Sequence, residues 1–80
     1  MDEKERAEKD IKKLEAIIHE FKSYKFKKYD EVLEWAVNYF HDSKHFFDKG
    51  DYFSAFGAAN YAYGIIDGLL ILEKKKGDEC

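Results

Sequence analysis

Two histidines four residues apart, in the stretch His41-Asp42-Ser43-Lys44-His45, are the first candidates for chemistry in this sequence. Two histidines at this spacing on a helix can bind one metal ion, and a carboxylate beside the first can act as a general base. An aspartate stands where such zinc sites use glutamate, and no third ligand is evident, although Glu34 and Asp48 lie nearby on the helix. We therefore expect His41 and His45 to lie on a solvated face, without a metal or cofactor.

Asn60 and Asp67 are polar exceptions in an apolar run. They are seven residues apart, which places them on one side of a helix. A buried carboxylate must be paired or hydrogen-bonded, or its pKa rises. We expect both side chains to be buried, with Asp67 accepting a hydrogen bond from a tyrosine hydroxyl or a lysine of the first two helices. The alternative is a small polar pocket or a partner contact. One carboxylate and one amide make no recognisable catalytic pair, so we expect no enzymatic activity.

Lysines alternate with aromatic residues over 22–29 (KSYKFKKY). Stacked rings with flanking lysines can hold a single nucleic-acid strand without sequence preference. The whole chain, however, has a net charge of -3 and contains no arginine besides Arg6, so no global field draws it to nucleic acid or to anionic lipid. We expect a loop whose rings cover the core while its lysines stay in water, and nucleic-acid binding through 22–29 is the alternative function.

The elements that position these residues follow from the spacing of apolar side chains. The 80 residues contain no proline, which favours helices, and they suffice for one domain spanning 1–80. A first helix is predicted over about 3–22 from the stripe Ala7, Ile11, Leu14, Ile18 and Phe21. A second is predicted over about 29–49, with Asp30 as its N-cap. Its apolar side comprises Tyr29, Val32, Leu33, Ala36, Phe40, Ser43 and Phe47, flanked by Trp35, Tyr39 and Phe46.

The dipeptide Gly50-Asp51 predicts a tight turn between two antiparallel helices. Glycine is favoured just past a helix end, where the backbone becomes left-handed, and aspartate is a preferred N-cap. A third helix is then predicted over about 52–75. The predicted architecture is an all-α, antiparallel three-helix bundle.

The third helix carries two stripes. One comprises Ala55, Ala58, Ala59, Ala62, Ile66 and Leu69, and the roughly opposite one comprises Gly57, Tyr61, Gly64 and Gly68. Each interior glycine costs about 1 kcal/mol relative to alanine, so three on one face imply the close approach of another backbone, from this chain or from a second copy. We predict a protein–protein interaction module that forms a homodimer or binds a larger protein through this helix and the aromatic flank Trp35, Tyr39 and Phe46.

The apolar residues 52–72 also have about the length of a membrane span, and Lys74, Lys75 and Lys76 follow them. Asn60 and Asp67 interrupt the segment, and the first two helices need it as their core, so we expect no membrane insertion. The polar N-terminus does not resemble a signal peptide, and the lone Cys80 fits a reducing compartment. The expected location is the cytoplasm.

The run from Phe47 to Gly68 (FDKGDYFSAFGAANYAYGIIDG) contains the patterns KGDY, A-F and NYA, followed by a glycine three residues before an aspartate. In these patterns it resembles the archaeal family known as domain of unknown function 357. The resemblance covers about half the chain, whereas the first helix is similar only in length and pattern. It implies a compact helical domain from an archaeon, and it implies neither an activity nor site residues.

Overall fold

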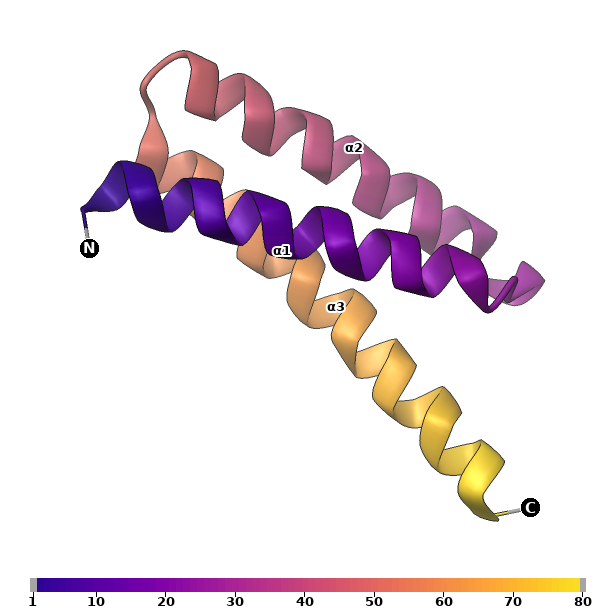
Figure 1. The fold of residues 1–80 in the computed structure, drawn as a ribbon. Coiled ribbons are helices and arrows are strands. Elements are labelled where there is room, and N and C mark those ends of the chain that lie inside the picture. The colour runs from indigo at the N-terminus through magenta and orange to yellow at the C-terminus, as the bar shows by residue number, and fades with distance from the viewer. Residues whose placement is uncertain (1, 80) are drawn as a thin grey trace.

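Three α-helices make up the computed structural model, which describes the backbone of residues 2–79 and the side chains of residues 2–74. They are α1 (Glu3–Ser23), α2 (Asp30–Asp48) and α3 (Tyr52–Glu79), with a short 3-10 turn, η1 (Lys27–Tyr29), before α2. Successive helices run antiparallel (Figure 1), and no strand occurs within residues 2–79. The predicted all-α three-helix bundle is confirmed.

The turn between α2 and α3 has the geometry that its sequence predicts. Gly50 has a positive φ of 82°. Its N–H donates to the Phe47 carbonyl at 2.9 Å, and the Asp51 N–H donates to the Phe46 carbonyl at 2.9 Å. This is the Schellman pattern, which satisfies the last carbonyls of a helix. The Asp51 carboxylate accepts a hydrogen bond from the Ser54 N–H at 3.1 Å and so caps α3 as predicted.

Two predicted helix ends need correction. Asp30 does not cap α2, because η1 leads directly into the helix and Asp30 already has helical φ and ψ of -57° and -40°. A capping side chain needs an extended residue at that position. Asp30 instead places a negative charge in the first turn, where the helix dipole favours it. At the other end, α3 continues to Glu79, four residues beyond the predicted limit.

The core lies where the three helices meet, and the predicted apolar stripes supply most of it. Phe21, Leu14 and Ile66 are its largest fully buried apolar side chains. The inner face of α3 contributes small residues, so α1 and α2 both approach it closely. The cluster of buried residues comprises Leu14, Ile17, Ile18, Phe21, Ala36, Ala59, Ala62, Ile66 and Leu70.

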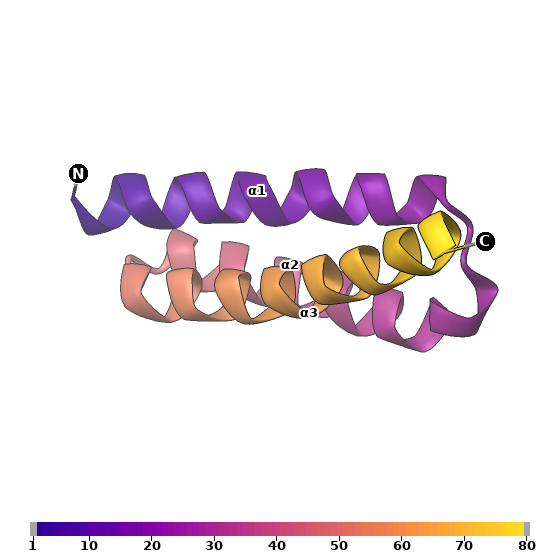
Figure 2. The same cartoon turned by 90° about the horizontal axis from the view of Figure 1, so that it is seen from below.

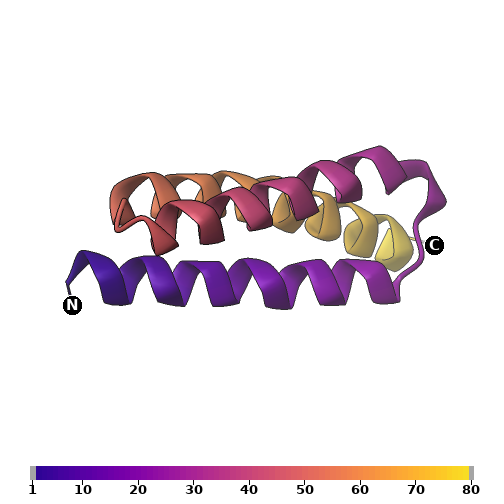
Figure 3. The same ribbon diagram turned by 90° about the horizontal axis from the view of Figure 1, so that it is seen from above.

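The bundle is elongated, and α3 is tilted. Its extents are 46 × 25 × 16 Å and its radius of gyration is 13.6 Å, against about 11.6 Å for a compact chain of this length. Figure 1 shows α3 crossing α1 at an angle, so that its last turns project away from both other helices. From below and from above the three helices lie alongside one another (Figures 2 and 3), so the divergence is confined to one direction. One side of α3 is therefore left uncovered.

Candidate interaction surface on the third helix

The uncovered side of α3 carries apolar side chains and glycines instead of charges. Its large apolar side chains are exposed to solvent: Phe53 is 76% exposed, and Tyr61, Ile71 and Leu72 are each more than half exposed. Gly57 and Gly64 are exposed between them, and Gly68 is partly exposed. We call this surface the glycine face, comprising Phe53, Gly57, Tyr61, Gly64, Gly68, Ile71 and Leu72.

The glycines of this face meet nothing within the described chain. A Cβ atom placed on Gly57, Gly64 or Gly68 would have no neighbouring atom within 4 Å. Close packing against α1 or α2, one of the two explanations offered by the sequence, is therefore excluded. Each glycine still weakens the helix by about 1 kcal/mol relative to alanine. The isolated bundle gains nothing in packing for that loss.

An aromatic cluster fixes the one large side chain in the middle of the glycine face. The Tyr61 ring packs edge-on against Trp35 and Tyr39 of α2, with centroid distances of 5.6 and 5.5 Å. The Trp35 and Tyr39 rings are 4.5 Å apart. The structure thus brings together two residues of the predicted aromatic flank with Tyr61, whereas Phe46 makes no ring contact with any described residue. Tyr61 is held in place and yet remains 56% exposed.

Asn60 is half-buried and hydrogen-bonded, although full burial was expected. Its amide nitrogen donates to Asp10 Oδ2 of α1 at 2.8 Å and to the Phe56 carbonyl at 3.0 Å. The first bond ties α3 to α1 near the beginning of both helices. The side chain therefore contributes to register.

The expectation for Asp67 is wrong. The side chain is only partly buried, and among the described residues it accepts no hydrogen bond from a tyrosine or a lysine. It lines an open hollow of about 300 Å³ between α1 and α3, together with Lys13, Glu20 and Lys74. The physical reason is the direction of the side chain: Ile66 and Leu70 are buried in the core, whereas Asp67 lies at the edge of the contact between α1 and α3 and lines the open hollow. The carboxylate is therefore partly accessible to solvent.

The basic segment 22–29 packs its rings largely on itself. Phe26 and Tyr29 surround Phe21, with centroid distances between 5.5 and 5.9 Å. Tyr24 stacks on Phe26 at 5.3 Å and, at 44%, is the most exposed of the described rings of the segment. Lys22, Lys25, Lys27 and Lys28 are exposed, as expected. One free ring does not make a stacking platform for successive bases.

The segment is fastened to α3 by a carboxylate that the sequence did not single out. Glu73 Oε1 accepts a hydrogen bond from the Tyr29 hydroxyl at 2.5 Å and lies 2.8 Å from Lys28 Nζ. The hydrogen bond to Glu73, with partial burial, raises the pKa of Tyr29, and the same carboxylate raises the pKa of Lys28. A second tie joins Lys74 Nζ to Glu20 Oε2 at 3.2 Å. These contacts hold the C-terminal half of α3 against η1 and α1.

His41 and His45 both lie on the exposed face of α2, as predicted. Within the part of the chain that the structure describes, no three histidine, cysteine, aspartate or glutamate side chains gather closely enough to hold a metal ion. Neither histidine faces a hollow that would exclude water. The geometry offers no support for chemistry at this pair.

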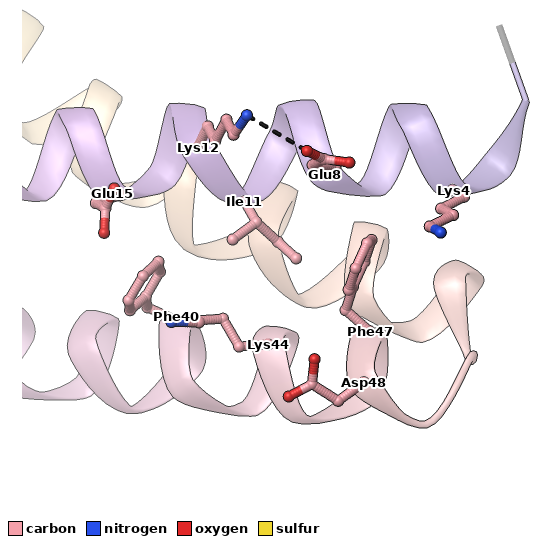
Figure 4. Close-up of a pocket in the computed structure, with 9 residues that line it drawn as sticks. All are labelled: Lys4, Glu8, Ile11, Lys12, Glu15, Phe40, Lys44, Phe47 and Asp48. Atoms are coloured by element: carbon pink, nitrogen blue, oxygen red, sulfur yellow. Dashed lines mark ion pairs between the residues drawn. The ribbon is translucent and has the colours of Figure 1, made fainter.

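A second hollow, of about 380 Å³, lies between α1 and α2 near the N-terminus (Figure 4). Ile11, Phe40 and Phe47 form its apolar floor, and its charged rim consists of Lys4, Lys12, Lys44, Glu8, Glu15 and Asp48. Lys12 is already paired with Glu8 at 3.4 Å. With three cations and three carboxylates on the rim, the hollow has no net charge that would select a ligand.

Among the residues that the structure describes, one helical stretch, over Tyr52–Lys74, has the length and apolar composition that a membrane span requires. Of the 18 most apolar consecutive residues in this helix, 28% are buried in the bundle. The exposed remainder includes the glycine face. The apolar residues of the glycine face therefore contribute to the membrane-like composition of this helix.

Sequence reasoning missed three members of this surface, Phe53, Ile71 and Leu72. A signal for two of them was present, because Phe53 precedes Gly57 by four residues and Leu72 follows Gly68 by four. Residues four apart lie on one side of a helix. Extending the glycine stripe by one step in each direction would have included both.

The chain was compared with known proteins at three levels. Neither the curated proteins nor the solved structures provided a match. A family model matches residues 4–74, across all three helices and beyond the half of the chain that carried the resemblance, and the chain belongs to the family described as "Protein of unknown function (DUF357)".

Proposed function

We propose that this protein acts as a protein–protein interaction module and that the glycine face of α3 is its binding surface. One observation carries the proposal: Gly57, Gly64 and Gly68 border open space, on a face whose other members are exposed apolar side chains. Interior glycines in a helix are compensated when another backbone approaches closely. No described part of this chain does so, which leaves a partner.

The anchored Tyr61 supports the same proposal. Tyrosine and tryptophan dominate binding energy at interfaces, and a side chain already held in its bound conformation loses little entropy on association. Contacts with Trp35 and Tyr39 restrict the Tyr61 ring while more than half of its surface stays accessible. A rigid aromatic group beside two glycines offers a partner both a projection and a depression.

Photo-crosslinking tests the proposal directly. Phe53 is replaced by p-benzoylphenylalanine, which preserves its aromatic character, in the full chain expressed in its source cells. The matched control places the same residue at His41, which is exposed on α2 away from the glycine face. We expect a protein adduct at position 53 and none at position 41. Irradiation that yields no adduct at position 53 would overturn the proposal.

Nucleic-acid binding through 22–29 has weaker support. The segment carries four lysines and no acidic residue, but Lys28 is engaged with Glu73 and two of the three rings are packed inward. Phosphate contacts weaken steeply with salt. Under this alternative, a labelled single strand binds at 50 mM salt and dissociates at 200 mM, and replacing Lys22, Lys25 and Lys27 by glutamine abolishes the binding.

A further inference from the structure

The residue spacing along the centre of the glycine face is the same in both directions along α3. Its central line consists of Phe53, Gly57, Tyr61, Gly64, Gly68 and Leu72. The successive spacings are four, four, three, four and four residues, so the line is symmetric about a point between Ala62 and Tyr63. Two identical helices packed antiparallel about such a point present each residue to its counterpart on the other side of the midpoint.

We infer that the occupant of the glycine face is a second copy of this chain, with the two α3 helices antiparallel and Tyr61 of each copy seated on Gly64 of the other. The inference rests on the proposed function, because it requires the glycine face to be a binding surface. It adds the identity of the partner, the direction of the helices and their register.

Side-chain sizes agree with this register at every step. Each Tyr61 ring meets a glycine, where open space receives it. Gly57 lies opposite Gly68, so the two backbones can come close on either side of the centre. Phe53 lies opposite Leu72, and these exposed apolar side chains close both ends. From Phe53 to Leu72 the contact extends about 28 Å along the helix, at 1.5 Å per residue.

A parallel pair of helices does not fit the same residues. It would set Tyr61 against Tyr61 in the middle, where two rings that are both fixed by Trp35 and Tyr39 would hold the backbones apart. The glycines would then face one another across a gap that no side chain fills. Unfilled space of this kind forfeits dispersion contacts, so the antiparallel arrangement is favoured.

Charges at the two ends of α3 are complementary in the antiparallel register. The turn that begins α3 carries Asp48 and Asp51, both exposed, whereas the far end carries the exposed Lys74, which also pairs with Glu20 of α1 at 3.2 Å, near the lysines of 22–29. The register sets Asp51 of one copy opposite Lys74 of the other. Opposite charges at the rim of an interface guide orientation more than they add affinity. A parallel pair would bring like charges together at both ends.

The first experiment is the mass of the purified chain in detergent-free buffer, by size-exclusion chromatography with light scattering from about 1 to 100 µM. We expect twice the 9.5 kDa chain mass at the upper concentrations and dissociation on dilution. Gly64→Leu should raise the dissociation constant roughly tenfold or more, because the leucine occupies the seat of Tyr61. His41→Leu, which adds the same side chain to the exposed face of α2, should leave it unchanged.

The second experiment tests direction and register with single cysteines in a Cys80→Ser background. Gly57→Cys and Gly68→Cys are oxidised separately and as a mixture. We expect a disulfide-linked dimer only in the mixture, since a disulfide needs Cα atoms within about 7 Å. Linked dimers from each variant alone would indicate parallel helices and overturn the register.

A monomer at every concentration would contradict a second copy as the partner. A monomer that floats with phosphatidylglycerol vesicles would contradict it as well, because a membrane would then cover the glycine face. In the crosslinking experiment at Phe53, an adduct of another mass would leave the interaction module intact while the homodimer fails. The absence of any adduct would contradict the proposed function itself.

Discussion

The two sides of α3 are both built from small residues, and they differ in what lies against them. On the inner side, Ala55, Ala59 and Ala62 are completely buried beneath α1 and α2. On the outer side, the three glycines border open space. Alanine retains a Cβ atom that fills the contact and favours the helix, whereas glycine contributes neither. An alanine whose methyl group contacts another helix therefore indicates close packing within the chain. A glycine stripe does not by itself indicate such packing.

The sharpest test of this difference replaces one isoleucine on each side. Ile66→Ala removes a fully buried side chain from the core and should lower the free energy of unfolding by about 2–5 kcal/mol. Ile71→Ala, at a position that is 57% exposed, should change it by about 0.5 kcal/mol or less at low protein concentration. Urea denaturation at 1 µM provides both values. Equal losses would mean that the outer side is covered within the chain.

A second pair adds volume instead of removing it. Ala59→Leu places a large side chain in a fully packed site and should cost about 1–3 kcal/mol. Gly64→Leu meets no atom and improves helix propensity, so it should stabilise the monomer by about 0.5–1 kcal/mol. Thermal melts at protein concentrations below the dissociation constant of the dimer measure the effect of each substitution on the monomer. A destabilised Gly64→Leu monomer would contradict the open space seen at that residue.

The third comparison concerns the two polar side chains of α3. Asn60→Leu removes the hydrogen bond to Asp10 and should cost about 0.5–1.5 kcal/mol. Asp67→Leu breaks no hydrogen bond to a described residue and should change stability by about 0.5 kcal/mol or less. If Asp67→Leu proves the more damaging substitution in chemical denaturation, Asp67 has a stabilising partner in solution that is absent among the residues described in this structure.

The smallest effects are those of pH at the two ends of α3. Glu73 raises the pKa of Tyr29, so the folded state holds that proton more tightly, and the stabilisation is complete below pH 10 and lost as the pH rises through the folded pKa. The Ser54 contacts lower the pKa of Asp51, so its contribution is present above pH 3.8 and lost as the pH falls through the folded pKa. Melting temperatures from pH 3 to 11, compared with those of Tyr29→Phe and Asp51→Asn, measure both. The difference between wild type and Tyr29→Phe should shrink above pH 10.

Local sequence signals predicted most of the fold. The apolar spacing located three helices to within a few residues, and Gly50-Asp51 predicted the turn together with its cap. These features depend on interactions between residues close in sequence. The N-cap at Asp30 failed because a 3-10 turn ahead of it depends on Phe21 and on packing with the rings of 22–29, which helix-capping preferences alone do not contain.

The site was predicted less completely, because it depends on how the helices cross. Periodicity placed Gly57, Tyr61 and Gly64 on one side of α3, opposite the alanines. It could not determine which side chains at the edge of the contact between α1 and α3 reach a partner, and this distinguishes the hydrogen-bonded Asn60 from Asp67, which lines an open hollow. The crossing angle arises from the sizes of facing side chains on all three helices together. A helical projection treats each helix as if it were alone.

The ring contacts of Trp35 give the molecule a built-in optical reporter. Trp35 is the only tryptophan in the chain, and its neighbours Tyr39 and Tyr61 lie close enough for excitation energy to pass from tyrosine to tryptophan. Its emission is therefore sensitive to the docking of α2 on α3 and to whatever covers the glycine face. Dilution at constant temperature should shift that emission while the far-ultraviolet circular dichroism stays constant. Heating the diluted chain should then change both signals together.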